Sequence, residues 1–455
     1  MAEKTLTENV KSFIGRQVVS YLDGDPDENI PKLLAWADRF DKNDMFPSQR
    51  AAFHRVVDDP DNNWYRLIKS LWTDIDPDVR KTVFENFLVN ATLVGMSRQK
   101  KTAGENGCNV PWAILMDPTS ACNLHCTGCW AAEYGNRLNL SYDELDSIIR
   151  QANDMGTYMF LYTGGEPLVR KRDIVRLCEA HPDSMFLAFT NGTLIDDAFA
   201  EDMLRVKNFI PAISVEGFEE ATDGRRGAGT YGHVMNAMRI LREHRLPFGA
   251  SCCYTSANYD SISSEAFIDH LVGCGAKFAW FFHYMPVGND AVTDLLPTPD
   301  QRETFMRRIR SYRDTKPIFT IDFQNDGEYV GGCIAGGRNY LHINAAGDVE
   351  PCAFIHYSDS NVREKTLLEA YTSPLFMAYH DNQPFNDNML RPCPMLENPE
   401  FLQMMVRKSG AASTDVASPE PAEKLCDKCV EYARAWQPRA EKLWRAEQTA
   451  RERKA

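Results

Sequence analysis

The chain has 455 residues, of which 44% are hydrophobic and 25% charged, a composition typical of soluble globular proteins. Its 64 acidic and 50 basic side chains give a net charge of −14, which disfavours nucleic acid and anionic membrane surfaces as partners. The sequence shows neither an apolar signal core near its beginning nor an apolar run near the roughly 18 residues of a membrane span, so we expect a cytoplasmic protein with no transmembrane segment. In that reducing compartment, 13 cysteines favour metal ligation over disulfides.

Residues 1–108 are predicted to form a helical N-terminal region that prolines divide into short helices. Apolar residues recur at helical spacing in two stretches, Val10, Phe13, Ile14, Val18, Val19 and Leu22, then Trp64, Leu67, Ile68, Leu71 and Trp72. We interpret the region as a helical cap or an interface element. The stripe around Trp64, Tyr65 and Trp72 is interpreted as core packing, with contact to a lipid or a partner left open.

Residues 109–317 alternate between strands and helices. The expected strands are Trp112–Met116, Met159–Tyr162, Met185–Phe189, Phe209–Val215, Phe248–Tyr254 and Lys277–Tyr284. The amphipathic stretches between them are Ser141–Met155, Lys171–Glu179, Asp196–Val206, Tyr231–Glu243 and Ser263–Gly273. Such repeats predict a parallel sheet with right-handed crossovers, in which ligands bind at the carboxyl ends of the strands.

Residues 318–455 lose this alternation. One hairpin is predicted, Tyr340–Ile343 with Val349–Cys352, and Lys408–Pro421 is expected to be a loop. The tail from Tyr432 to Ala455 is charged and predicted helical. This segment also holds the last five cysteines of the chain.

Three cysteines follow the first predicted strand with the spacing Cys-x3-Cys-x2-Cys, at Cys122, Cys126 and Cys129. Three thiolates so close together repel one another, so a soft metal is their natural partner. Zinc sites usually take four protein ligands in two pairs. Three cysteines instead suit a [4Fe-4S] cluster with one open iron site.

With Gly164-Gly165-Glu166-Pro167 at the end of the second strand, the sequence resembles the radical S-adenosylmethionine (SAM) superfamily. In that family the glycine–glycine–glutamate–proline backbone and carboxylate meet the amino group of the cofactor's methionine. Glycines allow close backbone approach, and a carboxylate matches an ammonium. The resemblance implies an α/β fold, a partial (β/α)6 TIM-type barrel with the N-terminal helical region and a cysteine-containing C-terminal extension.

Further strand ends carry the same resemblance. Ser214, Glu216 and Arg226 are similar to the strand-four pattern of the branch with SPASM auxiliary-cluster domains, where the Arg pairs with the cofactor carboxylate and Arg225 could substitute. Thr190 and Asn191 match the strand-three element, and residues 285–288 match the strand-six loop near the adenine. One departure is Gly128, because the family usually has an aromatic residue there that shields the adenine; Trp130 is a candidate replacement.

Cys333, Gly347 and Cys352 follow the Cys-x13-Gly-x4-Cys opening of the SPASM signature. With Cys393, Cys426 and Cys429 they imply one auxiliary Fe–S cluster in residues 318–455, while a zinc or mononuclear iron site and no metal at all stay open. The other cysteines are interpreted as small core residues: Cys108, Cys178, Cys252, Cys253 and Cys274.

The resemblance implies an enzyme in which a one-electron donor such as flavodoxin or ferredoxin drives cleavage of SAM to a 5′-deoxyadenosyl radical, which takes hydrogen from a substrate C–H. An auxiliary cluster would accept an electron from the substrate radical, which favours oxidation or coupling. The substrate stays open between a small molecule, a lipid and a peptide. A maturase or activase acting on a protein is the alternative, and a non-enzymatic Fe–S sensor leaves the SAM motifs without a purpose. Asp117, Tyr254, His283 and Asp322 receive no catalytic role.

Overall fold

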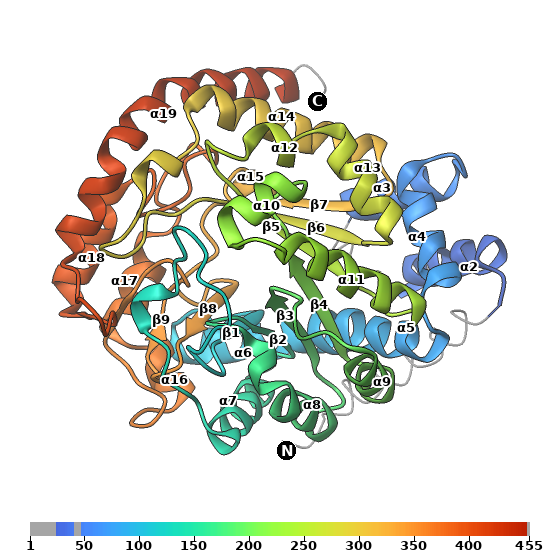
Figure 1. Ribbon diagram of the computed structural model, residues 1–455, viewed down its shortest axis with the longest axis horizontal. Helices are drawn as coiled ribbons and strands as arrows, with labels where there is room; N and C mark the ends of the chain where they lie inside the picture. The colour runs from blue at the N-terminus through green and yellow to red at the C-terminus, as the bar shows by residue number, and fades with distance from the viewer. Residues whose placement is uncertain (1–23, 41–46, 453–455) are drawn as a thin grey trace.

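The computed structural model describes residues 24–40 and 47–452. Their centre is one sheet with the strand order β7-β6-β5-β4-β3-β2-β1-β8-β9. All neighbours from β7 to β8 run parallel, and only β9 is antiparallel. The sheet curls into an open barrel with helices outside it (Figure 1). The apolar stretch Val10–Leu22 and the residues before it lie outside the described residues.

The six predicted strands are present within one residue of the expected bounds, and the amphipathic segments between them are helical. The predicted α/β partial-barrel fold is therefore confirmed. The strands are β1 Ala113–Met116, β2 Met159–Tyr162, β3 Met185–Thr190, β4 Phe209–Ser214, β5 Gly249–Tyr254 and β6 Phe278–His283. The helices are α7 Tyr142–Met155, α8 Lys171–Ala180, α9 Asp197–Val206, α10 Glu219–Arg226, α11 Thr230–Glu243, α12 Tyr259–Ile262, α13 Glu265–Cys274 and α14 Pro299–Thr315. Ser141 illustrates their boundaries, because its side chain and Glu144 form a capping box at the start of α7.

The sheet continues beyond the six expected strands. β7 (Phe319–Asp322) pairs parallel with β6, and β8 (Tyr340–Ile343) pairs parallel with β1. The predicted hairpin is confirmed, since β8 pairs antiparallel with β9 (Val349–Glu350). A boundary between residues 317 and 318 therefore cuts through one continuous sheet, because the C-terminal segment supplies both ends of the barrel wall.

The N-terminal helices lie at the amino ends of the barrel strands. They are α2 Pro26–Phe40, α3 Pro47–Val57, α4 Asn63–Asp74, α5 Pro77–Phe84, the π-helix η2 Glu85–Gly95 and α6 Met96–Asn106. Trp64 on α4 packs against Phe319 at the start of β7, with ring centroids 5.7 Å apart. Asn63 donates its side-chain amide to the carbonyls of Arg313 and Lys316 at the end of α14. The expected helical cap thus packs at the end of the barrel where the strands begin, which we call the lower end.

The C-terminal segment forms α15 Gly327–Val330, α16 Leu367–Tyr371, α17 Pro374–Asn382, α18 Pro399–Ser409 and α19 Ala422–Glu452. The helical tail begins ten residues before the predicted Tyr432, so that Cys426 and Cys429 lie on α19. The predicted loop contains the short β11 (Ala412–Ser413), which pairs with β10 (Tyr357–Ser358). α19 runs along the outside of the molecule beside α14 (Figure 1). Within the described ranges, no helix has both the length and the apolar content needed to cross a lipid bilayer.

Candidate active site

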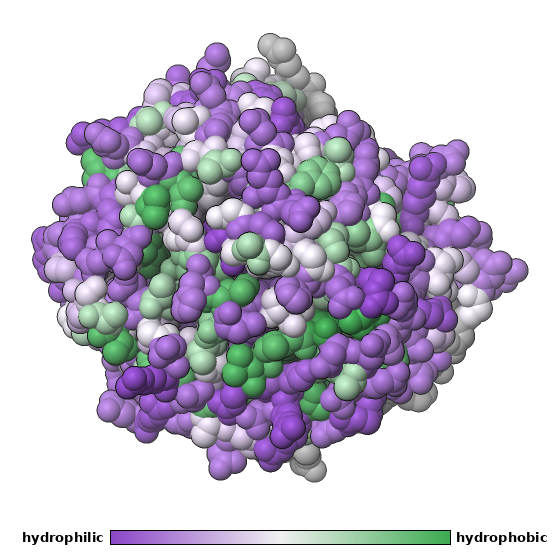
Figure 2. Space-filling view, in the orientation of Figure 1, coloured by the Kyte–Doolittle hydropathy of each residue, from purple (hydrophilic) through white to green (hydrophobic). Residues whose placement is uncertain are grey.

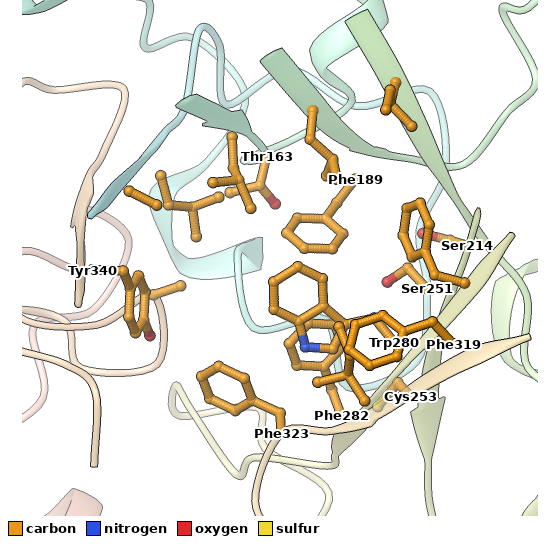
Figure 3. A pocket seen from close by; sticks show the side chains of 18 of the residues that line it. Thr163, Phe189, Ser214, Ser251, Cys253, Trp280, Phe282, Phe319, Phe323 and Tyr340 are labelled. Atoms are coloured by element: carbon orange, nitrogen blue, oxygen red, sulfur yellow. The ribbon is translucent and has the colours of Figure 1, made fainter. Parts of the chain in front are cut away.

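The barrel encloses a cavity of about 950 Å³. Side chains alternate along a strand, so every second residue of the barrel strands points inward. On β6 these residues are Phe278, Trp280 and Phe282, which line the cavity, while Ala279 and Phe281 are more deeply buried behind them. TIM-type barrels usually fill their interior with bulky side chains. Here the interior leaves room for a ligand (Figure 3).

The upper end of the cavity lies at the carboxyl ends of the strands, and the cysteine loop and the end of β2 form it. Cys122, Cys126 and Cys129 all line the cavity. The backbone N–H of Gly165 donates to Thr119 O at 3.0 Å, and that of Glu166 donates to Ala121 O at 2.8 Å. A Cβ on Gly165 would come within 2.2 Å of the Ala121 carbonyl oxygen, so only glycine lets these two segments approach.

The Glu166 carboxylate is buried and accepts three hydrogen bonds. They come from Leu168 N at 2.9 Å, Thr190 Oγ1 at 2.6 Å and Asn191 N at 2.7 Å. Burial raises the pKa of Glu166, and these hydrogen bonds oppose that rise. Glu166 therefore ties the end of β2 to the end of β3. Asn191 continues the connection, because its side chain donates to Asn123 Oδ1 in the cysteine loop at 2.8 Å.

Glu216 is fully buried between two arginines. Its Oε1 lies 2.7 Å from Arg225 Nη1 and 2.5 Å from Arg226 Nη2. Its Oε2 accepts a hydrogen bond from Cys253 N at 3.1 Å. One carboxylate between two guanidinium groups leaves one positive charge at the cavity wall, where both arginines also contribute lining atoms. Arg225 Nε is buried without a hydrogen-bond partner, and Arg226 Nη1 is 3.8 Å from Cys126 Sγ.

An aromatic ring covers Gly128 from outside the cysteine loop. A Cβ on Gly128 would meet Tyr284 Cε2 at 2.7 Å, and Gly128 has a φ of +65°. Trp130 instead packs edge-on against His342, Phe354 and His356. Tyr284, which follows β6, is therefore the aromatic side chain that lies against Gly128, while Trp130 is another residue of the cavity wall.

His283 fixes the backbone that carries Tyr284. Its Nδ1 donates to Tyr284 O at 2.6 Å, so Nε2 accepts from Tyr432 on α19 at 2.7 Å. Burial lowers the pKa of His283 well below its usual range, which keeps the ring neutral in this pair of hydrogen bonds. His283 thus links the barrel to the C-terminal helix.

The five C-terminal cysteines gather in one apolar cluster beside the cavity. Tyr340 lines the cavity and donates its hydroxyl to Cys352 Sγ at 2.6 Å. The pKa of Cys333 is raised to about 12 by burial and by the nearby charge of Cys352, among others. Cys393 Sγ accepts two backbone N–H groups, from Met395 and Leu396, both at 3.4 Å. Cys426 and Cys429 reach the cluster from one turn of α19.

These features fit the cofactors that the sequence implies. The three loop thiols share one end of a cavity, and the excess arginine charge beside them suits a carboxylate or the negative charge of a thiolate-bound cluster. Among the described residues, no three His, Cys, Asp or Glu side chains surround one point that a single ion could occupy. A four-iron cluster makes a different demand, because each thiolate binds a different iron.

The comparisons with known proteins agree with this site. The model of the radical SAM superfamily matches residues 116–270. Residues 116–270 therefore form a radical SAM domain. Its curated relatives include the AdoMet-dependent heme synthase of Methanosarcina barkeri, 23% identical over 58% of this chain and 82% of the relative. The PqqA peptide cyclase of Gluconobacter oxydans is 26% identical over 70% of this chain and 94% of the relative.

Solved structures share the fold of this radical SAM chain. The crystal structure of Streptococcus suis SuiB bound to the precursor peptide SuiA has a TM-score of 0.54 at 18% identity, covering 70% of this chain and 76% of that one. The matched domain begins in β1 and ends in α13, so it contains the cysteine loop and the SAM-binding residues predicted between Gly164 and Arg226. The chain is accordingly a radical SAM enzyme with a [4Fe-4S] cluster and SAM as cofactors.

The structure brings most of the predicted SAM-binding residues to one cavity. Those that line it are Gly164, Gly165, Glu166, Asn191, Ser214 and Arg226. Thr190 and Glu216 lie one layer behind, where they hold Glu166 and the arginines, and Pro167 is buried at the start of the turn η4 (Pro167–Arg170). Sequence reasoning missed two members of the wall.

The first missed residue is Tyr284. The sequence feature that pointed to it was the glycine at position 128, which leaves room for an aromatic ring from another part of the chain. The second is Cys253, which was interpreted as a core residue but lies on the cavity wall near Ser214 and Ser251 (Figure 3). The pKa of Cys253 is raised to about 11 by burial, against the opposing charge of Arg225. Its position on β5 gave the signal, because Ser251 and Cys253 are two apart and share the inward face. The remaining four cysteines of that group do not line the cavity.

Proposed function

We propose that the chain is an oxidising or coupling radical SAM enzyme of the SPASM type, with the radical cluster on Cys122, Cys126 and Cys129. These three cysteines would hold a [4Fe-4S] cluster with an open iron, which when bound would supply the electron that converts SAM to methionine and a 5′-deoxyadenosyl radical. The residues of the chain bind SAM, hold it against the loop and shield the radical from water.

Each predicted SAM-binding residue receives a role in this proposal. Gly164 and Gly165 bring the backbone close to the methionine amino group. The surplus charge of Arg225 and Arg226 binds the methionine carboxylate. Tyr284 covers the adenine, and Ser214 lies beside the ribose. Glu166, Pro167, Thr190, Asn191 and Glu216 position the residues that bind.

The position of Tyr340 carries the second part of the proposal. Its ring contributes to the cavity wall and its hydroxyl contacts Cys352, so only one side chain separates the substrate space from the C-terminal cysteines. A cluster on Cys333, Cys352 and some of Cys393, Cys426 and Cys429 would accept the electron that a substrate radical loses on oxidation. In this proposal the protein works in the reducing cytoplasm with a low-potential donor such as flavodoxin or ferredoxin.

The experiment is anaerobic reconstitution followed by iron and sulfide counts, with the double variant Cys333→Ala, Cys352→Ala. We expect the variant to lose the iron of one cluster and all turnover of substrate, while it still forms 5′-deoxyadenosine. Intact turnover would exclude an auxiliary cluster as electron acceptor. A maturase acting on a partner protein, as the alternative, would be indicated by a tight partner that copurifies.

The substrate is not given by the relatives, because proteins of similar identity carry the names of a heme synthase and a peptide cyclase. It must be inferred from the cavity of this chain.

A further inference from the structure

We propose that the substrate is a long, unbranched hydrocarbon chain, which lies along the inside of the barrel with one C–H bond below the cysteine loop. This inference rests on the proposed radical function and adds the class of substrate to it. The observations that carry it are the composition of the wall, the small number of hydrogen-bonding groups between its two ends, its length and its lower opening.

The wall below the SAM-binding residues is mostly apolar, and β5, which contributes Ser251 and Cys253, is the exception. Aliphatic and aromatic side chains alternate inward along the sheet: Leu115 on β1, Met159 and Leu161 on β2, Met185, Leu187 and Phe189 on β3, Ile210 on β4, and Ile321 on β7. Phe189, Trp280 and Phe282 lie with their ring centroids 5.3–5.5 Å apart. The aromatic cluster continues to Phe323, whose ring centroid lies 5.3 Å from that of Phe282 and 6.1 Å from that of Tyr340 (Figure 3).

Charged groups are confined to the two ends of the cavity. Glu166, Arg225 and Arg226 are at the SAM end. Lys277 is at the lower end and is already paired, with Asp74 at 2.5 Å and with Ser70 Oγ at 2.9 Å. Between these ends the wall offers few hydrogen-bonding groups, among them Ser251 and Trp280 Nε1, which is buried without a partner. A ligand with many polar groups would therefore lose hydration that this wall cannot replace.

The wall also disfavours a peptide as the occupant of the barrel. Each peptide unit carries a donor and an acceptor that need partners when buried. The backbone groups of β1–β6 are used by the strand-to-strand ladders, and among the inward side chains of the lower barrel Trp280 offers a single N–H in an otherwise apolar lining. A hydrocarbon chain makes no such demand, and burying it is favourable in proportion to its apolar area.

The length of the cavity suits an extended chain. Its lining runs from Ala113 and Phe278 at the amino ends of the strands to Asn191 and Tyr284 at their carboxyl ends. A strand of six residues, such as β6, spans roughly 20 Å. A chain that enters from below can therefore place an inner or terminal carbon beside SAM.

The lower end opens among exposed aromatic side chains. Phe53 is 53% exposed, Phe87 41% and Phe319 43%, although all three also line the cavity. They come from α3, η2 and β7, so helices of the N-terminal cap frame the opening. On the face drawn in Figure 2, most of the rim of the molecule is polar. The cap thus gives an apolar chain a path into the barrel.

The chemical step is balanced without further reactants. One electron from the low-potential donor breaks the sulfur–C5′ bond of SAM, which gives methionine and the 5′-deoxyadenosyl radical. That radical takes a hydrogen atom from a C–H bond of the chain. The products of the step are 5′-deoxyadenosine and a carbon radical on the hydrocarbon.

Binding is tested first, without any need for SAM cleavage. The reconstituted protein is loaded with the fluorescent fatty acid cis-parinaric acid, and palmitate is added as competitor. We expect displacement by palmitate, and at least a tenfold weaker affinity in Leu187→Trp and Ile210→Trp, which fill the lower barrel. Val416→Trp, which adds the same bulk at a side chain that is 59% exposed, should bind as the parent does. Melting curves verify that the variants fold.

Hydrogen transfer is tested second, with perdeuterated palmitate in one arm and vesicles of phosphatidylglycerol with perdeuterated acyl chains in the other. Deuterium in the 5′-deoxyadenosine from either arm supports the proposal. The arm in which deuterium is transferred shows whether the substrate is a free acid or a lipid. Cleavage of SAM without palmitate displacement and without deuterium in either arm would overturn it. If no SAM is cleaved at all, the radical function fails, and the displacement assay still decides whether the barrel binds a hydrocarbon chain.

Discussion

Tyr284 lies so close to Gly128 that a Cβ atom on residue 128 would come within 2.7 Å of its ring. The ring is held in place from both sides, because Val292 N donates to its hydroxyl at 3.0 Å and His283 binds its carbonyl. The glycine before the last cysteine of the loop and the tyrosine after β6 therefore occupy one space between them. An aromatic side chain is present beside the loop although the sequence carries none at position 128.

Tyr284→Ala should weaken SAM binding about tenfold, because an aromatic contact is worth roughly 0.5–1.5 kcal/mol. Tyr284→Phe keeps the ring and should retain the affinity within a factor of two to three, at roughly the size of one hydrogen bond to the hydroxyl or less. Isothermal titration of SAM into the anaerobic protein measures both. Equal affinities of Tyr284→Ala and the parent would show that Tyr284 does not cover the cofactor.

Glu216→Gln should lower the free energy of unfolding by about 3–5 kcal/mol, because it leaves two buried guanidinium groups without their carboxylate. Urea unfolding of the protein measures the change. Asp202→Asn is the matched control, since Asp202 pairs with Arg205 at 2.6 Å at the surface and such pairs are worth about 0–1 kcal/mol. If both substitutions cost the same, the Glu216 pair is not the structural link that its burial indicates.

His342 makes stability depend on pH. It lies buried between Asp117 at 2.9 Å and Glu350 at 2.6 Å. Burial opposes its charge, but the two carboxylates outweigh burial and raise the pKa of His342 from 6.5 to about 10. Because the folded pKa lies above the unfolded one, the stabilisation is fully present below about pH 6.5 and is lost as the pH rises through about 10.

We therefore expect the free energy of unfolding to fall between pH 7 and pH 10 more steeply in the parent than in His342→Gln. The variant should also be less stable at pH 7, by about 3–5 kcal/mol, because it leaves two buried carboxylates without their positively charged partner. Denaturant titrations at several pH values measure both effects. Parallel pH profiles for the two proteins would contradict a charged His342.

Tyr340→Phe removes the hydroxyl that donates to Cys352 but keeps the ring in the cavity wall. If Cys352 binds an auxiliary cluster, the electron paramagnetic resonance signal of that cluster should change and substrate oxidation should slow several-fold, while 5′-deoxyadenosine still forms. Phe323→Leu, another wall position, should leave the auxiliary signal unchanged. Identical spectra for Tyr340→Phe and the parent would count against Cys352 as a ligand.

The sequence was sufficient for the barrel and for most of the site. Short apolar runs such as Met159–Tyr162 and capped amphipathic stretches such as Ser141–Met155 predict where elements begin and end. Short motifs at strand ends must meet at one edge of a parallel sheet. This is why Cys126, Gly165 and Arg226 could be expected together before the fold was known. The joining of β8 to β1 could not be expected, because such pairing depends on contacts more than two hundred residues apart in the chain.

The cavity could not be predicted from the sequence either. An inward Leu187 or Ile210 has the same pattern whether its neighbours fill the barrel or leave it hollow, and the difference is set by the summed volumes of all inward side chains. The pairing of Glu216 with both Arg225 and Arg226 could not be predicted for a similar reason. Its two arginines follow on α10, and only the turn of that helix brings both back to one carboxylate.

The central claim is that the loop of Cys122, Cys126 and Cys129 generates a radical from SAM. The most direct measurement is the yield of 5′-deoxyadenosine from the anaerobically reconstituted protein with SAM and dithionite, compared with Cys126→Ser and with Cys274→Ser as the control outside the cavity. We predict 5′-deoxyadenosine from the parent and from Cys274→Ser, and none above background from Cys126→Ser. The same yield from Cys126→Ser as from the parent, or no cleavage by the parent with its full complement of iron and sulfide, would contradict the claim.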